Sequence, residues 1–172
     1  MLKPNLYMTL CFAATFLAAT LQAQTIIEYI PNNTSDDRYT LHSDGTVTDT
    51  WTWLIWQRCS LGQTWDGNTC TGTATTYTWQ GALQQASSNS FADYGDWRLP
   101  NIEELRSLVA YDRYDPAINS IVFPSTIGWY WSSSPSAGYS NGAWIVGFSS
   151  GYGGSSSRYT SGAHVRLVRG GQ

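Results

Sequence analysis

The stretch YWSSSPSAGYSNGAWIVGF, residues 130–148, decides the fold class. The segments at its two ends, residues 129–133 and 143–149, have the apolar character of β-strands, and a third such segment follows at 163–169. Between its two tryptophans the stretch carries only Ser, Gly, Ala, Pro, Tyr and Asn, which is typical of an exposed loop. The C-terminal part is therefore predicted to be an antiparallel meander joined by long Ser/Gly-rich loops.

Residues 38–59, RYTLHSDGTVTDTWTWLIWQRC, alternate apolar and polar side chains around an Asp44-Gly45 turn, which predicts a β-hairpin. The end of this segment is apolar on both faces of the expected strand, so we expect both faces to be buried. The residues on one face are Trp51, Trp53 and Ile55, and those on the other are Leu54 and Trp56.

Two segments have helical periodicity. Thr78 is a candidate N-cap, and the apolar residues that recur after it at helical spacing are Trp79, Ala82, Leu83 and Ala86. Asn101 and Glu104 have the spacing of a capping box at the start of a second helix. We expect about ten residues in each helix, close to the usual length in globular proteins.

The irregular segment after the second helix contains Asp115-Pro116, which is predicted to cap a single helical turn with proline at its first position. The element order is then hairpin, helix, helix, long loop and meander. This order predicts an α+β fold in which two short helices are segregated from the antiparallel strands.

The N-terminus has the pattern of a signal peptide over residues 1–23. Lys3 precedes the apolar run LYMTLCFAATFLAATLQA, and small residues lie just before Gln24. The run is short and interrupted by Thr, so we expect export without membrane insertion after signal removal, and an uncleaved anchor is the alternative. The protein is then secreted, periplasmic or at the cell surface, with a short segment at 24–37 before a domain at 38–172.

The composition is weakly acidic, with a formal net charge of −3 and Lys3 as the only lysine. Binding to nucleic acid requires a dense basic face, so this class of partner is not expected. A surface with few charges must be solvated by Ser, Thr, Asn and Gly, as in many exported binding proteins. An oligomer is compatible with these features.

Cys59 and Cys70 remain after signal removal, and in an oxidising compartment we expect them to form a disulfide. The Asp66-Gly67 turn signal between them folds the chain back. Closing so short a loop is worth about 3 kcal/mol in the chain-entropy model. A two-cysteine metal site is the alternative, but no histidine lies nearby in the sequence.

The motifs for catalysis and metal binding are weak. The GFSSG sequence at 147–151 matches a nucleophile elbow, but the residues after Ser149 cannot form the required helix, and no carboxylate follows Asp115. His42 and His164 have no partner ligands at metal-binding spacing. We therefore expect no catalytic residue, no cofactor and no metal.

Two further sets of charged residues have structural interpretations. Asp93 and Asp96 could supply oxygens to Ca²⁺, but the spaced ligand loop of a calcium site is not present. Arg166 lies on the strand face opposite Val165 and Leu167, and we expect that face to be exposed.

Long phrases of the chain resemble the Lcl C-terminal domain family of bacteria. The matching phrases are LIWQRCSLGQTWDGNTC, TWQGAL, YGDWRLPNIEELRSLV, YDPAINSIVFPST, YWSSS, AWIVGFSSG and VRLVRGG, and together they span residues 49–171. The resemblance implies a C-type-lectin-like fold, export, and, as in the best-known members, adhesion to glycosaminoglycans, with no enzyme activity. This chain has no collagen-like repeat, and its acidic composition disfavours a sulfated glycan.

The resemblance leaves two classes of function open. The first is a non-catalytic adhesin-type module that recognises a glycan or protein ligand on a surface. The alternative is an enzyme with a lectin-like fold, related to formylglycine-generating and sulfatase-modifying proteins. That alternative requires Cys59 and Cys70 to be unpaired.

The expected ligand surface comprises the loops at 132–142 and 150–164. Tyrosine gives rigid contact area and small polar residues give adaptable hydrogen bonds, as in antibody paratopes. The candidate binding residues are Tyr139, Asn141, Tyr152, Arg158, Tyr159 and His164. Trp131 and Trp144, in the adjoining strand phrases, are expected to lie mostly in the core.

The same loops suggest a diversified variable face. All their residue types between Tyr139 and His164 can be reached from an asparagine codon by changing only its adenines. The resemblance adds that C-type-lectin-like domains, members of this family among them, are scaffolds for adenine-directed diversification. We hypothesise that residues 139–142 and 151–164 vary in this way, and low-complexity drift is the alternative.

Overall fold

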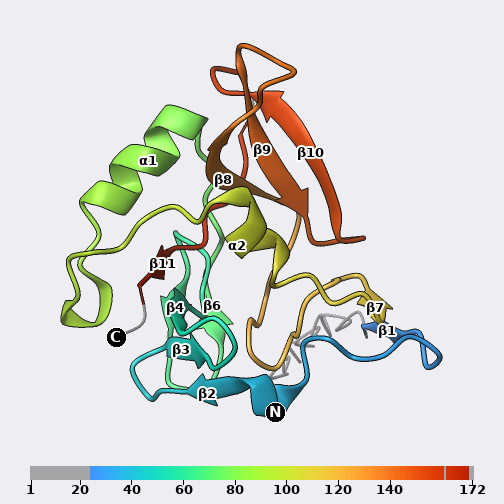
Figure 1. The fold of residues 1–172 in the computed structure, drawn as a ribbon. Coiled ribbons are helices and arrows are strands. Elements are labelled where there is room, and N and C mark those ends of the chain that lie inside the picture. Colours follow the sequence, from blue (N-terminus) through green and yellow to red (C-terminus); the bar gives the residue numbers. More distant parts are fainter. Residues whose placement is uncertain (1–23, 161, 171–172) are drawn as a thin grey trace, which may run out of the picture.

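The computed structural model describes residues 24–160 and 162–170, so the expected signal peptide at 1–23 lies outside the described residues. Two antiparallel sheets form most of the body, one above the other in Figure 1. The upper sheet has the strand order β10-β9-β8, with β8 (Trp129–Pro135), β9 (Gly142–Gly147) and β10 (Tyr152–Ser157). The lower sheet has the order β11-β4-β3-β2, with β2 (Tyr39–Leu41), β3 (Thr46–Asp49), β4 (Leu54–Gln57) and β11 (Val168–Arg169).

Two small strand pairs complete the sheets. They are β1 (Thr25–Ile26) with β7 (Arg113–Tyr114), and β5 (Thr64–Trp65) with β6 (Cys70–Thr71). The segment at 24–37 is thus joined to the rest of the chain through β1. The expected α+β fold with two short helices and antiparallel sheets is confirmed, and it is consistent with a small lectin-like fold.

Both predicted helix caps are confirmed. Thr78 accepts a hydrogen bond from Gly81 N at the start of α1 (Trp79–Ser87). Asn101 and Glu104 form a reciprocal capping box at the start of α2 (Ile102–Arg106). The expected length is right for α1, which has nine residues, and wrong for α2, which has five. A 3₁₀ turn, η2 (Phe91–Asp93), lies between the two helices.

The segment after α2 corrects one expectation. Asp115-Pro116 is a cis peptide bond and begins no helical turn. Asp115 has φ of 50°, outside the right-handed helical region, and its N–H donates to Ser149 O at 2.8 Å. This tertiary hydrogen bond fixes the backbone, and a proline signal read locally cannot anticipate it.

Strands β8 and β9 of the upper sheet are buried on both sides because their central residues alternate between two cores. Tyr130 and Val146 pack in one hydrophobic cluster, while Trp131 and Ile145 pack in the other. Trp131 is fully buried as expected, and Trp144 is only partly buried. The helix α1 contacts β8, and α2 contacts β8 and β9.

The C-terminal segment differs from the sequence prediction in its strand pairing. Residues 152–157, expected as loop, form β10, in which Tyr152 pairs with Gly147 and Ser157 with Gly142. Main-chain pairing with β9 runs along the whole of this edge strand, so its formation needs no apolar alternation. The third expected strand at 163–169 is reduced to β11 and isolated bridges at Ala163 and His164.

The hairpin around Asp44-Gly45 is confirmed as β2 and β3. Burial on both faces holds within β4, where Trp56 joins one core and Ile55 packs against the other. The expectation of burial is wrong for Trp51 and Trp53, which lie in a turn between β3 and β4 and are 65% and 63% exposed. A tertiary contact holds Trp51 in this position, because the Arg38 guanidinium lies against its ring.

Arg166 is fully buried, which corrects the expected exposed face. Its Nη1 donates to Gln57 O at 3.0 Å and to Arg58 O, and its Nη2 donates to Thr126 Oγ1 at 2.8 Å. The guanidinium also lies 4.9 Å from the ring centroid of Phe123. Oxygen acceptors replace water at the two Nη atoms, and an aromatic face covers the guanidinium, while the buried Nε has no hydrogen-bond partner among the described residues.

The expected disulfide between Cys59 and Cys70 is present, with a Cα–Cα distance of 5.4 Å. Asp66 accepts hydrogen bonds from the N–H groups of Asn68 and Thr69, which form the turn between β5 and β6. The predicted reversal at Asp66-Gly67 therefore brings the two cysteines together.

Candidate functional site

The structure does not bring the six predicted binding residues into one site. Four of them lie at one end of the upper sheet, in the β8–β9 connection and at the end of β10: Tyr139, Asn141, Arg158 and Tyr159. Tyr152 lies at the opposite end of β10. His164 lies beside Tyr130 of β8.

At the first end of the sheet, which we call the distal tip (residues 136–142 and 158–160), Arg158 holds the loop. Its Nε donates to Gly142 O at 3.0 Å and its Nη2 donates to Ser140 O at 2.6 Å. Its guanidinium lies 5.0 Å from the ring centroid of Trp79. Arg158 is therefore engaged by the protein itself, whereas Tyr139 and Tyr159 are 42% and 67% exposed.

His164 belongs to the framework of the domain. Its N–H donates to Trp129 O at 2.7 Å, and its Nδ1 lies 3.3 Å from Thr75 O. Burial, together with the charge of Arg166, lowers the pKa of His164 below its ordinary value. The residue is thus half-buried between strands and is not on the distal tip.

Tyr152 lies at the margin of an open groove of about 750 Å³ that β10 shares with the lower part of the molecule. We call it the aromatic groove, and define it by Trp51, Tyr111, Tyr152, Glu103 and Arg106. The three rings come from the β3–β4 turn, the segment after α2 and the start of β10. They are 65%, 61% and 65% exposed, respectively.

Tyr152 is supported by a cross-strand row of residues. Trp129 and Tyr152 both pair with Gly147, and their rings meet edge to face at 6.2 Å. A Cβ on Gly147 would lie 2.9 Å from the ring of Trp129, so only glycine leaves room for this arrangement.

A buried ion pair lies beneath the groove. Arg38 and Asp49 bond through two nitrogen–oxygen contacts, with Nε at 2.9 Å from Oδ1. Burial alone would raise the pKa of Asp49, but the hydrogen bonds from Arg38 and Thr52 outweigh burial and hold it below its usual value. Burial would likewise lower the pKa of Arg38, and the hydrogen bond to Asp49 reverses that effect.

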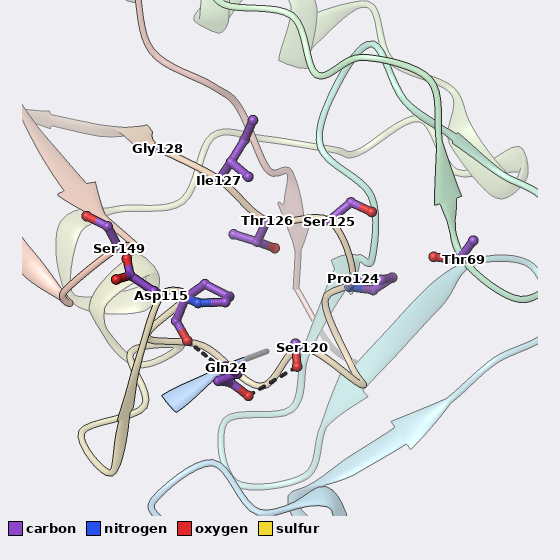
Figure 2. A pocket seen from close by; sticks show the side chains of 11 residues that line it. Gln24, Thr69, Asp115, Ser120, Pro124, Ser125, Thr126, Ile127, Gly128 and Ser149 are labelled. Carbon is purple, nitrogen blue, oxygen red and sulfur yellow. Dashed lines mark hydrogen bonds between the residues drawn. The ribbon is translucent and has the colours of Figure 1, made fainter. Parts of the chain in front are cut away.

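A second hollow, of about 680 Å³, brings Asp115 and Ser149 near one another (Figure 2). Gln24 forms part of its wall, donating to Pro116 O and accepting from Ser120 Oγ at 3.1 Å. No histidine is among the residues that line this hollow in the described part of the chain. Ser149 lies in a turn after β9, so the strand–helix context of a nucleophile elbow is not formed there.

The family comparison identifies the chain by its sequence. The family model described as the Lcl C-terminal domain matches residues 45–169. The chain belongs to the Lcl C-terminal domain family. A search of curated proteins finds no match to this sequence.

The matched part of the Lcl C-terminal domain begins in the β2–β3 turn and so excludes residues before it. Asn33 and Arg38, which help to line the aromatic groove, come from the segment before the match. The groove is therefore built jointly by the family domain and the residues that precede it in this chain.

Sequence reasoning missed the groove residues Trp51, Tyr111 and Arg106. The signal for Trp51 was present in the sequence, because Asp49 lies two residues before it and an aspartate side chain can accept from the backbone two residues on in an Asx turn. Asp49 forms this turn by accepting from Trp51 N at 3.1 Å and from Thr52 Oγ1 at 2.8 Å. Neither Tyr111 nor Arg106 carries a comparable local signal.

Other candidate sites in the domain have structural partners. Asp96 accepts a hydrogen bond from Arg169 Nε at 2.7 Å, and this bond lowers the pKa of Asp96.

Within residues 24–160 and 162–170, no three His, Cys, Asp or Glu side chains are grouped to hold a metal ion. None of the helices in these ranges is long and apolar enough to cross a membrane.

Proposed function

We propose that this Lcl C-terminal domain protein is an exported, non-catalytic binding module of the adhesin type. It recognises a glycan or protein ligand through the exposed parts of residues 132–142 and 150–164. The observation that carries this proposal is the exposure of Tyr139, Tyr152 and Tyr159 beside strands β8 and β9, whose side chains pack into two cores. Exposed aromatic side chains on a rigid framework are well suited to recognition, because little conformational entropy is lost on binding.

The state of the cysteines favours binding over catalysis. Cys59 and Cys70 are joined to each other, whereas the alternative of an enzyme related to formylglycine-generating proteins needs free thiols. A disulfide also persists best in an oxidising compartment, which supports the proposal of a secreted, periplasmic or cell-surface location.

The proposal is tested by screening the purified protein on a glycan array and by capture of ligands from extracts of cell surfaces. The variant Tyr139→Ala/Tyr152→Ala/Tyr159→Ala is expected to lose binding. Its free energy of unfolding should change little, because substitutions of exposed residues usually cost under about 0.5 kcal/mol.

The matched control is Tyr29→Ala/Tyr114→Ala, which removes two exposed tyrosines outside the proposed ligand surface. It should bind like the wild-type protein. Undiminished binding by the triple variant, or no ligand in either screen, would contradict the proposed function.

A further inference from the structure

We infer that the aromatic groove is a saccharide site, in which Trp51, Tyr111 and Tyr152 stack on the sugar rings of an uncharged oligosaccharide. The inference rests on the proposed function, names the ligand class, and extends the proposed ligand surface from Tyr152 to Trp51 and Tyr111. The groove volume of about 750 Å³ falls within the range of about 300–1,000 Å³ that is usual for small-molecule sites.

The lining has the chemistry that a sugar requires. The three rings offer flat apolar faces whose negative charge density attracts the C–H groups of a pyranose. The polar groups around them include Glu103 and Arg106, whose side chains are 79% and 46% exposed. A sugar hydroxyl is both a donor and an acceptor, so it can donate to the carboxylate and accept from the guanidinium.

The composition of the groove favours a sugar over a protein partner. None of the described residues that line it has an aliphatic side chain. Trp, Tyr and Arg also anchor protein interfaces, but those anchors lie in a fully desolvated core, whereas Asn, Thr, Ser and Glu side chains lie among the rings of this open groove. The experiment must therefore distinguish binding of a saccharide from binding of a polypeptide.

The ring of Trp51 is held in place although it is exposed. The Arg38 guanidinium lies 4.8 Å from its centroid, and this guanidinium also donates to Asn33 O at 3.2 Å and Ser107 O at 3.0 Å. Asp49 fixes the backbone of the same turn, with its main-chain oxygen accepting from Trp53 N at 2.8 Å. A ring that is already fixed before binding loses little conformational entropy when the ligand binds.

The rings of Tyr111 and Tyr152 are fixed by separate contacts. Asn33 accepts from Tyr111 N at 2.9 Å and donates to Val109 O at 2.8 Å, which anchors the chain that carries the ring of Tyr111. Tyr152 packs edge to face on Trp129. The β3–β4 turn also stores strain, because Trp53 has φ of 57°, and backbone strain of this kind is concentrated at functional sites.

The charges around the groove are balanced, which favours an uncharged ligand. Asp49 neutralises Arg38, and the Glu103 carboxylate lies 3.8 Å from the Arg106 guanidinium. Arg106 lies against β10 at Gly153, where a Cβ would be 3.0 Å from its Nη2. A sulfated or uronate-rich chain would find only Arg106 as an exposed cation among the described residues of the groove, and the Glu103 carboxylate beside it would repel the anionic groups of that chain.

The test uses the whole protein on an array of neutral hexose and N-acetylhexosamine oligosaccharides, together with uronate-containing and sulfated ones. We expect binding to neutral oligosaccharides, with an affinity that changes less than about twofold when salt is raised from about 0.05 to 0.5 M. The variants Trp51→Ala, Tyr111→Ala and Tyr152→Ala should each lose about tenfold or more in affinity.

The matched control is Trp53→Ala, which removes an equally exposed tryptophan from the same turn but outside the groove lining. It should bind within about twofold of the wild-type protein. All variants are first compared by their thermal unfolding midpoints, so that loss of folding is not taken for loss of binding.

The possible results separate the inference from the proposed function. If Trp51→Ala and Tyr111→Ala bind normally while the triple tyrosine variant does not, the groove inference is overturned and the proposed function stands. Binding only to sulfated chains, or only to a captured protein, also overturns the inference alone. Failure to bind any ligand overturns both.

Discussion

Arg38 and Asp49 form an ion pair whose side chains are 4% and 0% exposed, and this pair joins the turn before β2 to the end of β3. The carboxylate also organises the turn that carries Trp51, and the guanidinium lies under the indole. The pair therefore links the stability of the lower sheet to the shape of the aromatic groove.

Asp49→Asn is expected to lower the free energy of unfolding by about 3–5 kcal/mol, because it leaves the buried charge of Arg38 unpaired. Urea unfolding monitored by tryptophan fluorescence measures the loss. The control is Arg38→Met/Asp49→Leu, which removes both charges and should cost less than Asp49→Asn alone. A cost below about 0.5 kcal/mol for Asp49→Asn would contradict the structural role of the pair.

The same pair predicts a dependence of stability on pH. The folded pKa of Asp49 lies below its unfolded value of about 3.9, so the stabilisation is fully present above that pH. It is lost as the pH falls through the folded pKa. The unfolding free energies of the wild-type and Asp49→Asn proteins should therefore converge in acid, and a constant difference down to low pH would oppose this expectation.

Arg166→Lys is expected to destabilise the protein by about 3 kcal/mol although it conserves the charge. A lysine cannot reproduce the fork that reaches Gln57 O and Thr126 Oγ1, so buried acceptors are left without donors. Chemical denaturation measures this cost, and Arg106→Lys at an exposed position should change stability by less than about 0.5 kcal/mol. Equal effects of the two substitutions would indicate that Arg166 is exposed.

Replacing both cysteines by serine is expected to cost about 3 kcal/mol, since the disulfide closes a loop between residues only 11 positions apart. The folded protein should yield a linked Cys59–Cys70 peptide in non-reducing peptide mapping. Two alkylatable thiols in the native protein would refute the pairing and would restore the enzyme alternative.

Diversification of the loops predicts a specific pattern of substitutions among isolates of one strain. Differences should fall at adenines in the codons of residues 139–142 and 151–164, at exposed positions such as Tyr152 and Tyr159. Buried Ala163 should stay constant, because a larger side chain there would overpack the core. Sequencing the gene in many isolates measures this, and differences spread evenly over all bases and over β8 and β9 would end the hypothesis.

The sequence by itself determined the features that depend on near neighbours in the chain. The Thr78 cap, the Asn101–Glu104 capping box and the Asp44-Gly45 hairpin each involve residues only a few positions apart, so local chemistry specifies them. The disulfide follows from a turn within a short loop.

Only the tertiary structure decided which polar residues are buried and which distant side chains meet. Arg166 and Arg106 are chemically alike, yet one is enclosed by main-chain carbonyls from β4 and beyond while the other faces the groove. Segment 152–157 became a strand because main-chain pairing with β9 does not depend on a side-chain pattern. The aromatic groove unites Trp51, Tyr111 and Tyr152, which no local periodicity relates, because tertiary packing brings the β3–β4 turn, the segment after α2 and the start of β10 to one surface.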